Sequence, residues 1–181
     1  MNLANKITLL RVLMIPLFMI ILLSDFSNNT YIAALIFTIA SATDGIDGYI
    51  ARSRGQVTTF GKFIDPLADK LLVSTALISL VQLGKVPAWI VVIIIAREFT
   101  ITGFRIIAAS EGITIAASSL GKIKTITQLI AIISLLIDNF PFRLINFSFD
   151  IIMLYISLFF TVVSGVDYLY KNKHVLTTSK K

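Results

Sequence analysis

Charged residues are scarce in this chain, and cysteine is missing altogether. Of the 181 residues, 14% are charged and 56% are hydrophobic, whereas about a quarter of the residues in a typical soluble domain are charged. This composition excludes an ordinary soluble protein and indicates an integral membrane protein. Because the chain has no cysteine, disulfides, thiolate metal sites and a cysteine nucleophile are excluded as well.

The few charges are mostly positive, giving a formal net charge of +6. In a membrane protein, cationic cytoplasmic loops and their attraction to anionic lipids explain such an excess, so nucleic acid is not expected as a partner. The N-terminal segment resembles a signal peptide because Lys6 and Arg11 precede an apolar run, but no A-x-A cleavage site follows Leu23. We expect this segment to be retained as the first membrane helix.

Six apolar segments follow one another along the chain, at residues 12–23, 31–42, 71–83, 86–96, 126–137 and 151–163. Each is shorter than the roughly 20 residues that cross a bilayer, so each helix must extend into a polar flank. We therefore predict an all-α integral membrane protein with six transmembrane helices. Residues 1–170 form its single membrane domain, and residues 171–181 form a basic cytoplasmic tail.

The distribution of lysine and arginine predicts the orientation in the cell membrane. If the spans alternate in direction, Lys85 and Arg143 are the only lysine and arginine of the connections that fall on the outer side, and both termini are cytoplasmic. Charges within membrane helices are costly unless they face the protein interior or a wet cavity. We therefore predict a polar chamber facing the cytoplasm, formed by the charged residues at that end of the spans: Arg11, Asp44, Asp47, Asp65, Asp69, Arg97, Glu98, Arg105, Lys122, Lys124 and Asp167.

Four aspartates surround the connection between the second and third spans. Asp44 and Asp47 are three residues apart, and Asp65 and Asp69 are four apart, so each pair lies on one face of a helix. The short connection makes the two helices antiparallel neighbours, and their acidic faces can meet. Four carboxylates gathered at partial burial repel one another unless a cation neutralises them. Oxygen ligands without histidine or cysteine favour Mg²⁺, Mn²⁺ or Ca²⁺ over zinc.

Two glycines share these acidic faces. Gly48 lies four residues after Asp44, and Gly61 lies four residues before Asp65, so a ligand could approach the backbone at both positions. Close packing of membrane helices uses glycine in the same way, and both interpretations stay open. Arg52 continues the row of Asp44 and Gly48 by another turn, where a guanidinium is well placed to bind phosphate.

The stretch from Asp44 to Asp69 reads D-x-x-D-G-x-x-A-R, then eight residues, then G-x-x-x-D-x-x-x-D. This pattern resembles the signature of the CDP-alcohol phosphatidyltransferases. The segments "NLANKITLLRVLMIP", "VPAWIVVIIIAREFTITGFR" and "GKIKTITQ" are similar to the branch of the family whose acceptor is sn-glycerol 3-phosphate. One departure is the absence of the proline expected after the opening Asn-Leu, which concerns the entry of the first helix.

The resemblance implies a homodimeric enzyme in the membrane that transfers the phosphatidyl group of CDP-diacylglycerol to sn-glycerol 3-phosphate and releases CMP. It also implies two metal ions per active site, Mg²⁺ or else Mn²⁺, held by Asp44, Asp47, Asp65 and Asp69. Asp69 would in addition accept the proton of the attacking hydroxyl. The residues implied around the CDP group are Gly48, Arg52, Thr58 and Gly61.

An acceptor that carries a phosphate needs a cationic pocket of its own. Arg97 and Arg105 lie eight residues apart on one helical face, and Lys122 and Lys124 open the fifth span. We predict that these four residues bind the acceptor phosphate. Simpler roles stay open for three of them, because the lysines could be topology signals and Arg97 could pair with a nearby acid.

Two alternatives concern the function itself. Inositol phosphate, serine or phosphatidylglycerol could replace glycerol 3-phosphate, because the aspartate pattern is common to enzymes with all these acceptors. A divalent-cation transporter would also keep carboxylates in its spans, but its charges should line a path toward both faces. The single histidine, His174, is expected to be a solvated residue of the tail.

Overall fold

The computed structural model describes residues 3–53, 59–113, 115–116 and 118–173, without the side chains of residues 3–6, 44–53, 59–63, 65 and 66. This part of the chain is helical and contains no strand, which confirms the all-α prediction. The elements are α1 (Leu3–Leu22), α2 (Asn29–Ser53), α3 (Thr59–Gln82), α4 (Ala88–Ser110), α5 (Ser119–Leu136), the short 3₁₀ helix η1 (Phe142–Ile145) and α6 (Phe149–Lys171).

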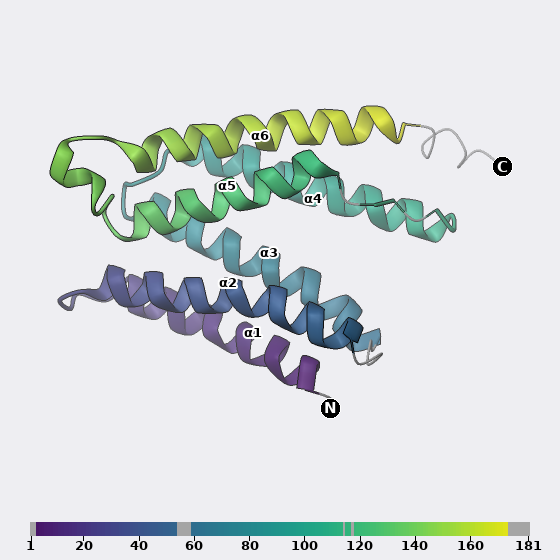
Figure 1. The fold of residues 1–181 in the computed structure, drawn as a ribbon, viewed down its shortest axis with the longest axis horizontal. Helices are drawn as coiled ribbons and strands as arrows, with labels where there is room; N and C mark the ends of the chain where they lie inside the picture. Colours follow the sequence, from purple (N-terminus) through teal and green to yellow (C-terminus); the bar gives the residue numbers. More distant parts are fainter. Residues whose placement is uncertain (1–2, 54–58, 114, 117, 174–181) are drawn as a thin grey trace.

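The six α-helices run back and forth along one common direction (Figure 1). One end of the bundle, here called the terminal end, holds the start of α1 and the end of α6, together with the end of α2, the start of α3, the end of α4 and the start of α5. The opposite end, called the far end, carries the α1–α2, α3–α4 and α5–α6 connections. As expected, α2 through α5 extend beyond their apolar segments toward the terminal end.

The core consists of aliphatic and aromatic side chains contributed by all six helices. Phe18 of α1 and Phe37 of α2 are fully buried, with ring centroids 5.8 Å apart, and Leu77 and Ile132 are buried with them in the same cluster. A second, smaller cluster near the terminal end joins α4 and α6 through Ile101, Phe104, Ala108 and Tyr168. This second cluster fixes α6 beside the polar end of α4.

Specific residues end the helices at both ends of the bundle. Gly84 follows α3 with φ of 71°, and Gly112 follows α4 with φ of 72°; a side chain is strained at such angles, which favours glycine. At the far end, the Lys85 ammonium donates to the Asp138 carboxylate at 2.6 Å and to the Leu135 carbonyl at 3.0 Å. These contacts join the α3–α4 connection to the end of α5.

Among the described residues, α5 and α6 are long and apolar enough to cross a membrane. Shorter apolar stretches occupy Ile7–Leu22 and Asn29–Thr43. The crossing of all six helices and the cytoplasmic orientation stay predictions. The predicted basic tail falls mostly outside the described residues, because α6 continues to Lys171 and the description ends at residue 173.

Candidate functional site

A cavity of about 500 Å³ opens at the terminal end between α3, α4, α5 and α6. All four residues predicted to bind the acceptor phosphate line it, so the structure brings them together. Their role in phosphate binding stays a prediction. The charged side chains around this cavity, here called the cationic cavity, are Asp69, Lys70, Arg97, Glu98, Arg105, Lys122 and Lys124.

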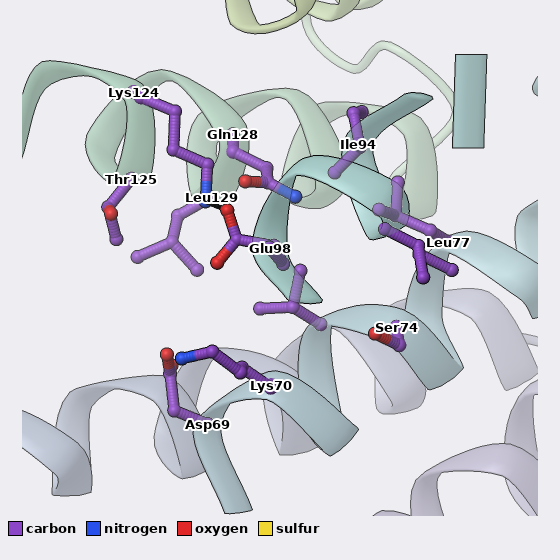
Figure 2. A pocket seen from close by; sticks show the side chains of 12 residues that line it. Asp69, Lys70, Ser74, Leu77, Ile94, Glu98, Lys124, Thr125, Gln128 and Leu129 are labelled. Carbon is purple, nitrogen blue, oxygen red and sulfur yellow. Dashed lines mark hydrogen bonds and ion pairs between the residues drawn. The ribbon is translucent and has the colours of Figure 1, made fainter. Parts of the chain in front are cut away.

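A smaller pocket of about 40 Å³ shares five lining residues with the cationic cavity and continues it toward the core. Figure 2 shows the side chains of Asp69 and Lys70 on the α3 side of this pocket, with Glu98 and Lys124 on the opposite side. The rest of the lining combines polar side chains, Ser74, Thr125 and Gln128, with apolar ones such as Ile94. The charged groups therefore stand where the cavity meets a mixed polar and apolar interior.

Glu98 joins α4 to α5 through two short ion pairs. One of its oxygens, Oε1, accepts from Lys124 Nζ at 2.6 Å and from Arg97 Nη1 at 2.9 Å. The side chains of Lys124 and Glu98 are only 7% and 18% exposed. A buried charge is tolerated when it is paired and hydrogen-bonded, and here one carboxylate serves two cations. Arg97 thus lines the cavity and also pairs with a nearby acid.

The two arginines of α4 also contact α6. Arg97 Nη2 donates to Ser164 Oγ at 2.9 Å. Arg105 Nε donates to the Tyr168 hydroxyl at 3.0 Å, and the carbon at the centre of its guanidinium lies 5.3 Å from the centre of the Tyr168 ring. Both hydrogen bonds combine a charged donor with a neutral acceptor, so they orient the arginines without neutralising their positive charge.

The cationic cavity is positively charged overall. Its described lining has five cationic and two acidic side chains. The first turn of α5 contributes as well, because Ser118 caps this helix by accepting from the Gly121 amide at 3.1 Å, and both residues line the cavity. A helix N-terminus carries partial positive charge and exposed amides. The arrangement is suited to binding an anion.

Asp69 is the one predicted metal ligand whose side chain is described, and it lines both the cationic cavity and the smaller pocket. Asp44 and Asp47 lie in α2 and Asp65 lies in α3, but their side chains lie outside the described residues. The same holds for Gly48, Arg52 and Gly61, and Thr58 lies outside the description altogether. The backbone nevertheless brings α2 and α3 into contact, as expected.

Several residues around the cavity had no predicted role. Glu98 was expected in the chamber only as one more charge, although an acid next to Arg97 in an apolar segment is a recognisable signal. Ser164 and Tyr168 resemble ordinary helix residues in the sequence, and only the packing of α6 on α4 shows their contacts. Asp167 was expected in the chamber, but it is not among the residues that line the cationic cavity. Its carboxylate instead pairs with Lys171 one turn later, at 2.8 Å.

Comparisons with known proteins agree with the pattern of the aspartates. The family model described as CDP-alcohol phosphatidyltransferase matches residues 1–163. The chain is 52% identical to the CDP-diacylglycerol--glycerol-3-phosphate 3-phosphatidyltransferase of Bacillus subtilis, over 98% of each sequence. It is 39% identical to a probable phosphatidylglycerophosphate synthase of Mycobacterium tuberculosis, over 92% of this chain and 79% of the relative. A Rickettsia felis protein with the same description as the Bacillus one is 38% identical over 92% of this chain and 93% of its own.

Proposed function

This chain belongs to the CDP-alcohol phosphatidyltransferase family, and from that premise we propose that it transfers the phosphatidyl group of CDP-diacylglycerol to sn-glycerol 3-phosphate. Relatives named for this reaction match nearly the whole chain. The cationic cavity, where Arg97, Arg105, Lys122 and Lys124 meet beside Asp69, supports an acceptor that carries a phosphate, and the names of the relatives favour glycerol 3-phosphate among such acceptors. A soluble acceptor with a phosphate group fits such a cavity better than a neutral one.

In the proposed reaction, the 1-hydroxyl oxygen of the acceptor forms a bond to the β-phosphorus of CDP-diacylglycerol. The bond from that phosphorus to the bridging oxygen breaks, and CMP leaves with the electron pair. The hydroxyl proton passes to the Asp69 carboxylate, which lines the cavity that would hold the acceptor. Holding the phosphate at the arginines and lysines while the hydroxyl faces Asp69 supplies the orientation that such a transfer needs.

The positive charges of the cavity exceed its negative charges, so an acceptor phosphate can be neutralised there. Arg97 and Lys124 share the Glu98 carboxylate, so an incoming phosphate adds a second anion to two cations that share only one. Arg105 and Lys122 complete its surroundings. Several cationic donors around one phosphate give charge-assisted hydrogen bonds, which are about twice as strong as neutral ones.

The donor set also fits a hard divalent cation. The Asp69 carboxylate offers oxygen ligands at a cavity, and the other three aspartates lie on the contacting helices α2 and α3. We propose that Asp44, Asp47, Asp65 and Asp69 would hold two Mg²⁺ ions, or Mn²⁺. Bound there, the ions would neutralise the diphosphate of the donor and make CMP a better leaving group. Gly48, Arg52, Thr58 and Gly61 are the proposed contacts of the CDP group.

We also propose that all six helices cross the cell membrane, with the terminal end in the cytoplasm and a homodimer as the assembly. The support for the membrane comes from the outer surface of the bundle, where every helix exposes large apolar side chains. A soluble monomer rarely exposes contiguous apolar patches of more than a few hundred Å². The exposed apolar side chains of this bundle include Leu10, Leu13, Ile20, Leu35, Ile78, Val92, Phe99, Ile126, Phe159 and Val166.

A transporter is less well supported by the described residues. Their charges gather toward the two ends of the bundle, at the cationic cavity and around Lys85 and Asp138. Between them lies the main apolar core, with buried residues such as Leu77, Leu80 and Leu135. The polar side chains buried in this region, such as Ser79, Ser134 and Ser157, are uncharged hydroxyls, whereas a path for a divalent cation would need carboxylates there.

The acceptor is tested by offering purified protein CDP-diacylglycerol with one candidate acceptor at a time and identifying the lipid product by mass spectrometry. The candidates are glycerol 3-phosphate, inositol phosphate, serine and phosphatidylglycerol. We expect phosphatidylglycerophosphate, formed only with glycerol 3-phosphate and only when Mg²⁺ or Mn²⁺ is present. A lipid product formed with a different acceptor would overturn the choice of acceptor and keep the chemistry. No product with any acceptor, from folded protein that binds Mg²⁺, would favour the transporter.

A further inference from the structure

One face of α6 contacts both arginines of the cationic cavity. Ser164, Gly165 and Tyr168 lie within four residues of each other, so they share one side of the helix. All three are buried. They also lie beyond residues 1–163, the part of the chain that the family model matches. We call these three residues the α6 face.

Each residue of the α6 face constrains an arginine in a different way. The Ser164 hydroxyl accepts from Arg97 Nη2 at 2.9 Å. Gly165 leaves room for the Arg97 side chain, because a Cβ atom at this position would lie 3.1 Å from Arg97 Cγ. The Tyr168 hydroxyl accepts from Arg105 Nε at 3.0 Å, while its ring lies near the guanidinium.

The position of Tyr168 is itself fixed by packing. Tyr168 is 3% exposed, and its ring meets Phe104 edge to face, with 6.0 Å between the ring centroids. A long arginine side chain has many rotamers, and ordering it costs conformational entropy. Because the rigid Tyr168 hydroxyl binds Nε of Arg105, the other N–H donors of the guanidinium are held in one orientation before a ligand binds. Such preorganisation raises affinity by lowering the ordering cost of binding.

We propose that the α6 face is a positioning surface that fixes Arg97 and Arg105 and thereby sets the affinity for the acceptor phosphate. This inference rests on the proposed function, because it assigns the two arginines to the phosphate of glycerol 3-phosphate. Ser164, Gly165 and Tyr168 are positioning residues, which act through the arginines and leave the transfer step itself unchanged. The acceptor KM should therefore depend on them, while kcat and the KM for CDP-diacylglycerol should not.

The test is steady-state kinetics of three variants in the full-length protein. Tyr168→Phe keeps the buried ring but removes the acceptor of Arg105, and we expect the KM for glycerol 3-phosphate to rise about tenfold. Ser164→Ala removes the acceptor of Arg97, and we expect a rise of about three- to tenfold. Gly165→Ala places a methyl group against the Arg97 side chain, and we expect a smaller rise in the same constant.

Matched controls separate positioning from a general effect on the helices. Gly103→Ala is the control for Gly165→Ala, because a Cβ at Gly103 has no atom within 4 Å. Tyr155→Phe is the control for Tyr168→Phe, because Tyr155 is 49% exposed on α6. Both controls should keep the wild-type KM for glycerol 3-phosphate. Thermal unfolding of every variant shows whether the fold is kept.

Two results would overturn the proposal while the wild type is active with glycerol 3-phosphate. One is an unchanged acceptor KM in Tyr168→Phe and Ser164→Ala, and the other is an equal rise in the KM values of both substrates. A wild-type protein that releases CMP with a different acceptor would overturn the proposed function, and this inference with it. The wild-type measurement therefore distinguishes the two failures.

Discussion

At the scale of single residues, Asp69 is the proposed proton acceptor, and its carboxylate lines both the cationic cavity and the smaller pocket. We predict that Asp69→Asn keeps the fold and still binds CMP but loses turnover, since an amide cannot accept the hydroxyl proton. CMP release measures the loss. Asp167→Asn is the matched control, because Asp167 pairs with Lys171 at the end of α6 and should keep wild-type activity. Full activity of Asp69→Asn would remove this carboxylate from the role of base.

Glu98 is a second single residue with a specific expected effect. Removing its charge leaves Arg97 and Lys124 without their shared anion in a largely buried place. We predict that Glu98→Gln lowers the free energy of unfolding by about 3 kcal/mol, measured by denaturation in detergent. Glu111→Gln is the control, because Glu111 is exposed after the end of α4. Equal stability of the two variants would contradict the structural role of Glu98.

How well residues could be predicted depends on how local their signals are. Arg97, Arg105, Lys122 and Lys124 were predicted to gather, and they do, because helical spacing and short connections fix their relative positions. The contacts of Ser164 and Tyr168 were not predicted, because they depend on how α6 packs on α4. Arg11 was predicted to lie in the polar chamber, but it is not among the residues that line the cationic cavity, and it is 1% exposed within α1. Burial of this kind depends on neighbouring helices and leaves no local pattern.

At the scale of elements, the start of α5 is both a helix cap and a part of the cavity wall. Ser118 caps this helix and lines the cationic cavity with Lys122. We predict that Ser118→Ala costs about 1 kcal/mol of stability and raises the KM for glycerol 3-phosphate, because the cap fixes the start of the helix that carries Lys122 and Lys124. Ser110→Ala, at an exposed position at the end of α4, should change neither quantity. An unchanged acceptor KM in Ser118→Ala would show that the cap has no part in binding.

The elements themselves were largely predictable. Six apolar segments gave six α-helices, and the polar extensions toward one end follow from the length that a membrane requires. The short 3₁₀ helix in the α5–α6 connection was not predicted. Its segment holds several exposed apolar residues, including Leu144 and Ile145, and composition alone does not distinguish a short helix from a loop there.

At the scale of the whole molecule, the two ends of the bundle are predicted to lie on opposite sides of the membrane. The chain has no cysteine, so one introduced cysteine is its only thiol. We predict that an impermeant thiol reagent labels Leu144→Cys in intact cells and labels Lys173→Cys only after the cells are opened. Leu144 lies at the far end, and Lys173 follows α6 at the terminal end. Labelling of both variants from outside would contradict the orientation.

The proposed function requires that the cationic cavity bind the phosphate of the acceptor beside Asp69. The most direct test is the dependence of CMP release on glycerol 3-phosphate in Arg105→Ala, with Arg143→Ala as the control at the far end of the bundle. We predict that Arg105→Ala raises the KM for glycerol 3-phosphate at least about tenfold, while the KM for CDP-diacylglycerol stays the same. Unchanged saturation by glycerol 3-phosphate in Arg105→Ala would contradict it.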